Sequence, residues 1–196
     1  ERLSRQRKHA APKLAAAVTL AMQQLGMAGG RFEVAVMPLD EPQSHGLDQV
    51  EFRVAGHAGS TPRALAKVAS GGELSRLALA IAVTTAQGGA NQGASVGTLI
   101  FDEIDAGVGG TVADSVGRLM KQLGRSAQVL AVTHLAQVAA CADGHFVVSK
   151  ALKGKQTLSD IHTVEGEARV AGGVRMLGGE KLSGMAHAQA LLGGLS

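Results

Sequence analysis

Residues 98–101 (TLIF) and 128–132 (QVLAV) are two short apolar runs, and a helix-like segment at residues 111–123 lies between them. Strand, helix and strand in this order, with apolar residues that follow one another without alternation, indicate parallel strands covered on both faces. We therefore expect an α/β fold in which a mostly parallel sheet is flanked by helices.

The first 25 residues predict a long helix. Residues 2–25 contain no glycine, and Leu14, Val18, Ala21 and Leu25 recur at helical spacing, which gives a narrow apolar stripe beside a charged face. An ordinary amphipathic helix and one strand of a coiled coil explain this pattern equally well. Because no capping residue precedes it, we expect the helix to be part of a longer one.

The rest of the chain divides into further short elements separated by glycine-rich connections. Strands are expected over residues 31–37 and 49–55, which alternate apolar and polar residues and predict a hairpin-like unit, and over residues 145–149 and 157–164. Helices are expected over residues 74–86, 168–177 and 183–192. The helix at 74–86 is nearly all apolar and should be buried on most faces. Residues 88–97 are rich in Gly, Ala and Asn and predict a flexible connection.

Composition narrows the classes of protein. A chain of 196 residues with 45% hydrophobic residues should fold around one main core. The apolar stretches fall short of the ~20 residues that a membrane helix needs, and no secretory signal opens the chain, so we expect a cytoplasmic protein without a membrane partner. A single cysteine excludes an internal disulfide, and the seven scattered histidines predict no zinc site.

The charge pattern permits contact with nucleic acid without requiring it. The formal charge is +3, and much of the basic excess lies in the first thirteen residues, where a solvated helix face explains it as well. Four Phe and no Tyr or Trp make base stacking improbable, so DNA contacts would be mainly to phosphate. Candidates for such contacts are Lys67, Arg76 and Lys121.

The most distinctive local motif is SGGELSR at residues 70–76, where a loop becomes a helix. Ser70 followed by Glu73 three residues later is a capping box, which by itself predicts only a helix start. Capping alone does not require Gly71 and Gly72. Residues without side chains at a helix N-terminus let backbone N–H groups approach a phosphate, so the motif also predicts an anion site.

A second motif is the pair of carboxylates that follows the strand at 98–101. Beyond the end of a parallel strand, Asp102 could hold Mg²⁺ through water, and Glu103 could orient and deprotonate an attacking water. This is the Walker B pattern. Taken alone, an acidic pair after a strand is also explained by a solvated turn.

Two further features follow this pair. Asp105 opens a glycine-rich loop at residues 105–110, which should bring backbone close to a neighbouring strand or to a second subunit. His134 follows the strand at 128–132 and is expected at the same sheet edge as the carboxylates. A lone histidine is usually structural, but at this edge it could hydrogen-bond a terminal phosphate.

The order and spacing of these motifs resemble the SMC-like branch of the ABC ATPase family. In that resemblance residues 70–73 match the signature motif, 99–103 Walker B, Asp105 the D-loop and His134 the switch histidine. Within the branch, the sequence most resembles the RecN family of DNA repair proteins. The residues that carry this resemblance are 67–76, 101–107, 132–139 and 175–179. The resemblance covers essentially the whole chain, although residues 2–30 and 88–97 match only in general character. Residues 171–173 (AGG) depart from it, because a better helix former is expected there.

The resemblance implies an ATPase head, with residues 1–27 as the root of a returning coiled-coil arm and residues 28–196 as the C-terminal lobe of the head. It implies ATP and Mg²⁺ as cofactors, Asp102 as the residue that holds the metal through water, and Glu103 and His134 as catalytic residues. The implied nucleotide-binding residues are Ser70, Gly71, Gly72, Glu73 and Asp105. Ser70 and its glycines would meet ATP bound on a second head, in an ATP-sandwiched homodimer.

A phosphate-binding loop of the form G-x-x-x-x-G-K-[ST] does not occur in the sequence, and residues 178–183 have its ingredients at the wrong spacing. The resemblance therefore implies an N-terminal Walker A half as a partner, without which ATP would not be hydrolysed. It also implies DNA as a partner, a role in double-strand break repair and recombination, and a cytoplasmic, nucleoid-associated location.

Two alternatives remain open from the sequence. The chain could be the head of another SMC-like or transporter-type ABC ATPase. It could also be a non-enzymatic dimerisation module, in which the signature helix and the Asp105 loop serve only assembly.

Overall fold

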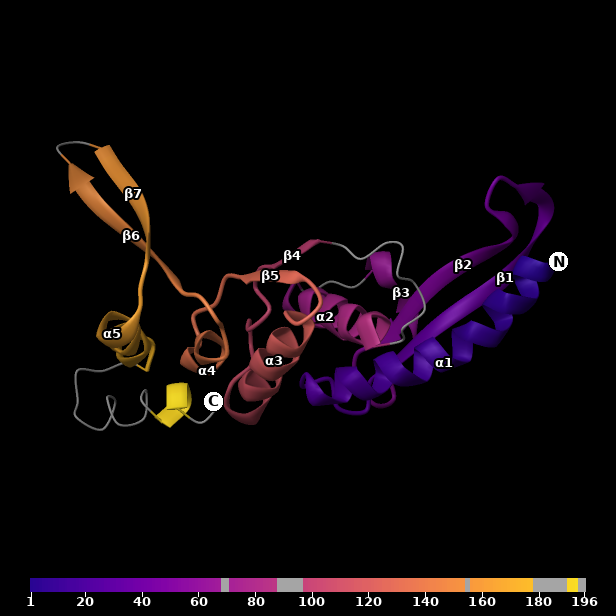
Figure 1. The fold of residues 1–196 in the computed structure, drawn as a ribbon. Coiled ribbons are helices and arrows are strands. Elements are labelled where there is room, and N and C mark those ends of the chain that lie inside the picture. The colour runs from indigo at the N-terminus through magenta and orange to yellow at the C-terminus, as the bar shows by residue number, and fades with distance from the viewer. Residues whose placement is uncertain (68–70, 88–96, 154–155, 178–189, 194–196) are drawn as a thin grey trace. The chain divides into compact units, whose positions relative to one another are not determined.

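The computed structural model describes residues 1–67, 71–87, 97–153, 156–177 and 190–193 (Figure 1). The chain divides into two compact units, residues 1–132 and residues 133–196. Each unit is described by itself below.

The first unit begins with a helix that lies along a long hairpin (Figure 1). Helix α1 spans Arg2–Gln24, and strands β1 (Arg31–Gln43) and β2 (Gly46–Ala55) pair antiparallel from Arg31 opposite Ala55 to Gln43 opposite Gly46. Only residues 44 and 45 connect the strands. Gly46 has a φ of +115°, a conformation that glycine adopts without steric cost. Strand β3 (Arg63–Ala64) pairs with β2, and the short 3₁₀ helix η1 spans Leu65–Lys67.

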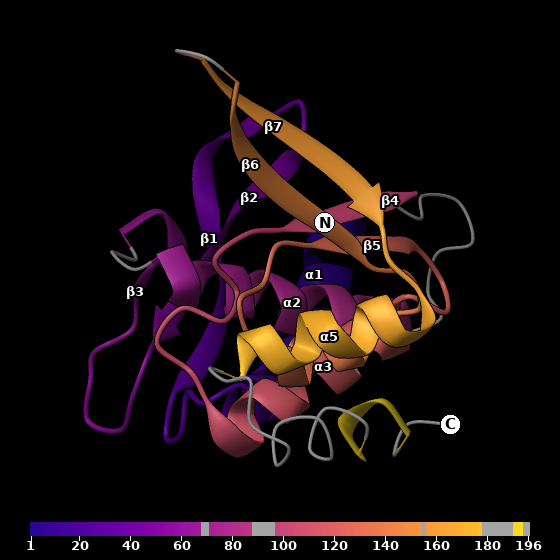
Figure 2. The same ribbon diagram turned by 90° about the vertical axis from the view of Figure 1, so that its left-hand side faces the viewer.

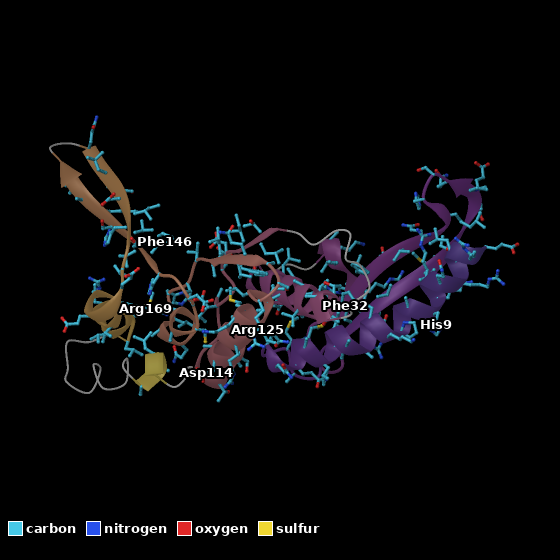
Figure 3. The ribbon with its side chains drawn as sticks, in the orientation of Figure 1. His9, Phe32, Asp114, Arg125, Phe146 and Arg169 are labelled. Atoms are coloured by element: carbon cyan, nitrogen blue, oxygen red, sulfur yellow. The ribbon has the colours of Figure 1, made fainter. Side chains whose placement is uncertain are left out.

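Side chains of α1 bind the β1–β2 hairpin at two places. Thr19 Oγ1 accepts a hydrogen bond from the backbone N–H of Phe32 at 3.0 Å, and the Phe32 ring packs at a tilt against Phe52 with 5.3 Å between centroids. Phe32 is buried at the start of β1 (Figure 3). Nearer the start of α1, Arg7 donates to the backbone oxygen of His45 at 2.7 Å and pairs with the buried carboxylate of Asp48 at 3.5 Å.

The second half of this unit contains helix α2 (Gly71–Gln87), strand β4 (Thr98–Phe101), helix α3 (Gly110–Leu123) and strand β5 (Gln128–Ala131). Helix α2 packs against both α1 and α3. The apolar positions of α2 and α3 that are buried in the resulting core are Leu77, Leu79, Ala80, Val83, Ala113, Val116, Met120 and Leu123. The expectation of a helix buried on most faces is met on one face only, since Leu74 is 43% exposed, and α2 begins earlier than expected, at Gly71.

Strands β4 and β5 are parallel, with Phe101 opposite Ala131, as the strand, helix and strand pattern predicts. The broader expectation of a mostly parallel sheet is not met among the described residues, because the sheet β1-β2-β3 and the sheet β6-β7 are antiparallel. The physical reason is the connection. A two-residue turn can join only antiparallel strands, whereas the crossover through α3 permits the parallel pair.

The second unit contains helix α4 (Ala136–Ala140), strands β6 (Phe146–Lys153) and β7 (Gln156–Thr163), and helix α5 (Gly166–Met176). The two strands form an antiparallel ribbon that extends beyond the helices of its own unit (Figures 1 and 2). Helix α5 continues through Gly172 and Gly173, so the glycine pair that departs from the family pattern does not interrupt it. Helices α4 and α5 pack against each other.

Arg169 joins the two helices of this unit. Its Nη2 donates to the backbone oxygens of Ala140 at 3.2 Å and Ala142 at 2.6 Å, at the C-terminal end of α4 (Figure 3). His145 lines a small cavity with Arg169. The pKa of His145 is lowered, first by burial and then by the positive charge of Arg169.

Several predicted elements lie in segments that the structure does not describe. Residues 88–96 and most of the helix expected at 183–192 lie outside the described residues, as does the 178–183 segment. No helix in the described part of the chain is long and apolar enough to cross a membrane. The division into residues 1–27 and 28–196 remains a prediction.

Candidate functional site

The two predicted carboxylates directly follow β4, which ends at Phe101. Both Asp102 and Glu103 are exposed, and the Glu103 backbone N–H donates to Asp102 Oδ1 at 2.9 Å. Glu103 has a φ of +54°, in the left-handed region that residues with side chains rarely adopt. Such a conformation costs roughly 1–3 kcal/mol and is often found at functional sites, where the surrounding structure holds it in place.

The glycines at the start of α2 lie directly against these carboxylates and the loop after them. A Cβ atom added to Gly71 would be 2.6 Å from Glu103 Oε2. A Cβ added to Gly72 would be 3.0 Å from Ala106 Cβ and 3.1 Å from the Ala106 backbone oxygen. Gly72 therefore has little room for a side chain, whereas the atom nearest to Gly71 is the end of the exposed Glu103 side chain, which can turn away.

Two side chains of the next turn of α2 hold the backbone on either side of Glu103. Ser75 Oγ donates to the backbone oxygen of Asp102 at 2.7 Å. Arg76 Nη1 donates to the backbone oxygen of Ala106 at 2.9 Å and lies 3.5 Å from that of Ile104. Glu103 thus occupies a short loop that α2 holds at both ends.

The expectation that Arg76 contacts a nucleic-acid phosphate is wrong. Only 8% of the residue is exposed, because its guanidinium points into the fold toward the 104–106 backbone. Burial lowers the pKa of Arg76, and the carboxylate of Glu73 partly counteracts this. The side chain is committed to contacts within the chain.

Glu73 and Asp105, which the sequence assigns to nucleotide binding, lie beside this loop. Asp105 is only 2% exposed, and its backbone oxygen accepts a hydrogen bond from the Val108 N–H at 3.3 Å. Glu73 is half-buried, with Oε1 4.0 Å from the position of a Cβ added to Gly56. In this structure both side chains are surrounded by residues of the same chain.

The described structure does not test the placement of the remaining two predicted residues. Ser70 lies outside the described residues. His134 is exposed and belongs to the second unit, where α4 begins two residues later and Thr133 Oγ1 accepts a hydrogen bond from the Leu135 N–H at 3.1 Å. Their membership of the site remains a prediction.

The residues present are compatible with a nucleotide and Mg²⁺. Exposed carboxylates are the hard oxygen ligands that Mg²⁺ prefers, and the first N–H groups of α2 have no intrahelical acceptors. No group of three or more His, Cys, Asp or Glu side chains in the described part of the chain is gathered to hold a metal ion by itself. A bound Mg²⁺ would therefore take most of its ligands from phosphate oxygens and water.

The roles of Ser75 and Arg76 were not predicted from the sequence. A signal for Arg76 does exist, because it lies three and four residues before the buried Leu79 and Ala80, on the stripe of α2 that faces the core. An arginine on an otherwise apolar helix stripe indicates a buried cation with partners inside the protein.

The fold belongs to a known class. The chain is similar to the Smc head domain from Pyrococcus yayanosii, with a TM-score of 0.57, 21% identity and coverage of 85% of this chain and 29% of that one. A second Smc head domain, from Pyrococcus furiosus, gives a TM-score of 0.54 at 19% identity, with 87% of this chain and 39% of that chain covered. No protein-family model matches the sequence. The fold is that of part of an SMC-type head.

The sequence specifies the relationship further. The chain is 43% identical to DNA repair protein RecN of Xylella fastidiosa strain Temecula1 over 192 residues, 97% of this chain and 34% of that protein. It is also 43% identical over 200 residues to DNA repair protein RecN of Streptomyces coelicolor, covering 95% and 34%. We identify the chain as a counterpart of the C-terminal part of RecN, and it spans about one third of the length of these relatives.

Proposed function

We propose that this chain is the C-terminal lobe of an SMC-type head that binds and hydrolyses ATP in DNA double-strand break repair and recombination. The observation that carries the proposal is the contact of Glu103, at the end of a parallel strand, with the glycine start of α2. Carboxylates at such a strand end and N–H groups at a helix start are the two components of a phosphoryl-transfer site that one lobe can supply. The similarity to proteins named DNA repair protein RecN supports the biological role.

The exposed face of β4 and β5 supports the proposal of a separate N-terminal partner. Ile100, Leu130 and Val132 are 71%, 40% and 64% exposed, and all three lie on one face of this two-stranded sheet. Parallel sheets are normally covered on both faces, and a two-stranded sheet is marginal by itself. We propose that the Walker A half of the same head covers this face and adds the phosphate-binding loop.

In the proposed mechanism Glu103 is the general base that takes a proton from the attacking water. The left-handed conformation of Glu103 and the hydrogen bonds to the backbone on either side of it support this role, because they restrain the backbone from which its carboxylate extends. Asp102 would hold Mg²⁺ through water, and the metal would neutralise negative charge on the phosphates. His134 would hydrogen-bond the terminal phosphate.

The proposed second partner is another copy of the head. In an ATP-sandwiched homodimer, Ser70, Gly71 and Gly72 would donate N–H groups to a phosphate bound on the opposite head, with Glu73 and Asp105 at the same interface. Hydrolysis removes the phosphate that joins the heads, so the dimer would open. DNA is the proposed partner of the assembled protein.

The experiment is the Mg²⁺-dependent ATPase activity of this chain alone, of a separately made N-terminal RecN part carrying Walker A, and of their mixture. We expect activity only in the mixture. Glu103→Gln should lower the turnover of the mixture by about 100-fold or more, because general-base catalysis contributes factors of that size. ATP-dependent dimerisation, followed by light scattering, should persist in this variant.

Glu41→Gln, an exposed residue of β1, is the matched control and should leave turnover unchanged. If nucleotide and Glu103→Gln both leave turnover and the oligomeric state unchanged, the chain is a non-enzymatic assembly module. If the chain alone hydrolyses ATP, the proposed division of the site between two lobes is wrong.

A further inference from the structure

Arg76 is a buried cation that the proposed chemistry does not use. It is 8% exposed, and its Nε is buried without a hydrogen-bond partner in the described part of the chain. Removing a cation from water is unfavourable unless its hydrogen bonds compensate. The contacts that Arg76 makes should therefore indicate what this side chain does in the fold.

Those contacts are with the backbone oxygens of Ile104 and Ala106, on either side of Asp105. A hydrogen bond from a charged donor is stronger than one between neutral groups, and the planar guanidinium can approach two acceptors from one direction. Arg76 therefore holds three consecutive residues of the loop, directly after the left-handed Glu103.

The loop also contains backbone hydrogen bonds of its own. Within it, the Ala106 N–H donates to the Glu103 oxygen at 3.1 Å and the Val108 N–H to the Asp105 oxygen at 3.3 Å. Gly107 has a φ of +71°, so the backbone turns sharply there. These local bonds form a turn, but they do not attach that turn to α2.

Attachment to α2 comes from two side chains and one close contact. Ser75 binds the backbone before Glu103, Arg76 binds the backbone after it, and Gly72 packs beneath Ala106. These contacts, which come from neighbouring residues at the start of α2, hold the loop that carries Glu103 against that helix.

We infer that Arg76 is a positioning residue that holds the 104–106 backbone to α2 and so keeps Glu103 and Asp105 in place against the glycine start of that helix. The structural part of this inference concerns the chain alone. Its catalytic consequence rests on the proposed function.

The structural part is tested by hydrogen–deuterium exchange of the 196-residue chain carrying Arg76→Gln. We expect the amides of residues 103–108 to exchange about ten-fold faster or more, as for a segment that opens locally, and those of the β1–β2 hairpin to be unchanged. Arg118→Gln removes the same charge from an exposed position on α3 and should change neither segment. Unchanged exchange at residues 103–108 in Arg76→Gln overturns the inference.

The catalytic part is tested in the mixture with the Walker A part. We expect Arg76→Gln to lower kcat by about ten-fold or more while KM for ATP changes less than about two-fold, because a displaced general base affects the transition state rather than nucleotide binding. Arg76→Lys, which keeps the charge and one donor direction, should recover part of kcat and serves where Arg76→Gln does not fold. A kcat within two-fold of the unsubstituted mixture contradicts the positioning role.

The proposed function and the inference about Arg76 can be contradicted independently of each other. If the unsubstituted mixture shows no ATPase activity, the proposed function fails, and the exchange measurement still decides whether Arg76 holds the loop. If the mixture is active and neither readout responds to Arg76→Gln, only the inference about Arg76 fails.

Discussion

At the scale of single residues, the glycines of the signature-like motif carry two separate requirements. Their approach to a phosphate is a prediction, whereas their approach to Glu103 and Ala106 is visible within this chain. Gly72 is buried with both side-chain and backbone atoms of Ala106 close by. Backbone atoms cannot yield as the end of a flexible side chain can, so this position should be intolerant of any side chain.

Gly72→Ala should lower the free energy of unfolding by about 1–3 kcal/mol, the usual cost of overpacking. Gly97→Ala is the control, because no atom of the described residues lies within 4 Å of the added Cβ there. Chemical denaturation of both variants measures the difference. If the two variants are equally stable, the 103–106 loop can move away from Gly72 without cost. That result would contradict the conclusion that α2 holds this loop in place.

At the scale of elements, helix α4 illustrates how a short segment depends on its neighbour. It has only five residues, Ala136–Ala140, and its N-cap Leu135 makes no side-chain cap hydrogen bond. A helix of this length is not stable by itself. Its last carbonyl groups are instead bound by Arg169 of α5, where a positive charge also interacts favourably with the helix dipole.

Arg169→Met should destabilise the second unit by about 1–3 kcal/mol, because hydrogen bonds from a charged donor are lost while the side-chain volume is nearly kept. Exchange of the α4 amides should accelerate accordingly. Arg175→Met, an exposed position on the same helix, is the control and should change little.

The same substitution has a second readout in the pKa of His145, measured by NMR. Removing the charge of Arg169 should raise this pKa, while burial, the larger cause, should keep it below the ordinary histidine value. An unchanged pKa together with unchanged α4 exchange would contradict the role given to Arg169.

At the scale of the whole molecule, exposed apolar residues indicate candidate interfaces in each of the two units. The face of β4 and β5 exposes Ile100 and Val132, and the β6–β7 ribbon exposes Phe146 and Val148 by 59% and 62% (Figure 3). Exposed apolar residues on a sheet face can mark an interface or promote aggregation. A chain spanning one third of its relatives is expected to have such surfaces.

The double substitution Ile100→Ser and Val132→Ser should weaken binding to the Walker A part by about ten-fold or more, because roughly 1.5–3 kcal/mol accompanies burial of each such side chain. Leu20→Ser, at a 62% exposed position on α1, is the control for loss of an exposed apolar residue. Isothermal titration calorimetry gives the Kd values. A double variant that binds as tightly as the unsubstituted chain would place the interface elsewhere.

The sequence by itself determined the positions of most described helices and strands, and it placed Asp102 and Glu103 at the end of a parallel strand. These conclusions depend on local spacing, which hydrophobic periodicity and turn residues record directly. The resemblance to the RecN family was likewise available from the order of short motifs, and the comparisons confirm it.

Only the tertiary structure decided which residues hold that strand end. The left-handed backbone of Glu103, the packing of Gly72 beneath Ala106 and the burial of Arg76 all depend on segments about 30 residues apart that meet in space. The antiparallel pairing of β6 with β7 was not predicted, whereas the hairpin-like unit expected from residues 31–37 and 49–55 is the antiparallel pair β1–β2. The direction of a strand's partner depends on the connection between the strands, which an apolar run does not record. Long-range contacts leave little trace in local spacing, so the sequence could locate the candidate site but not the side chains that support it.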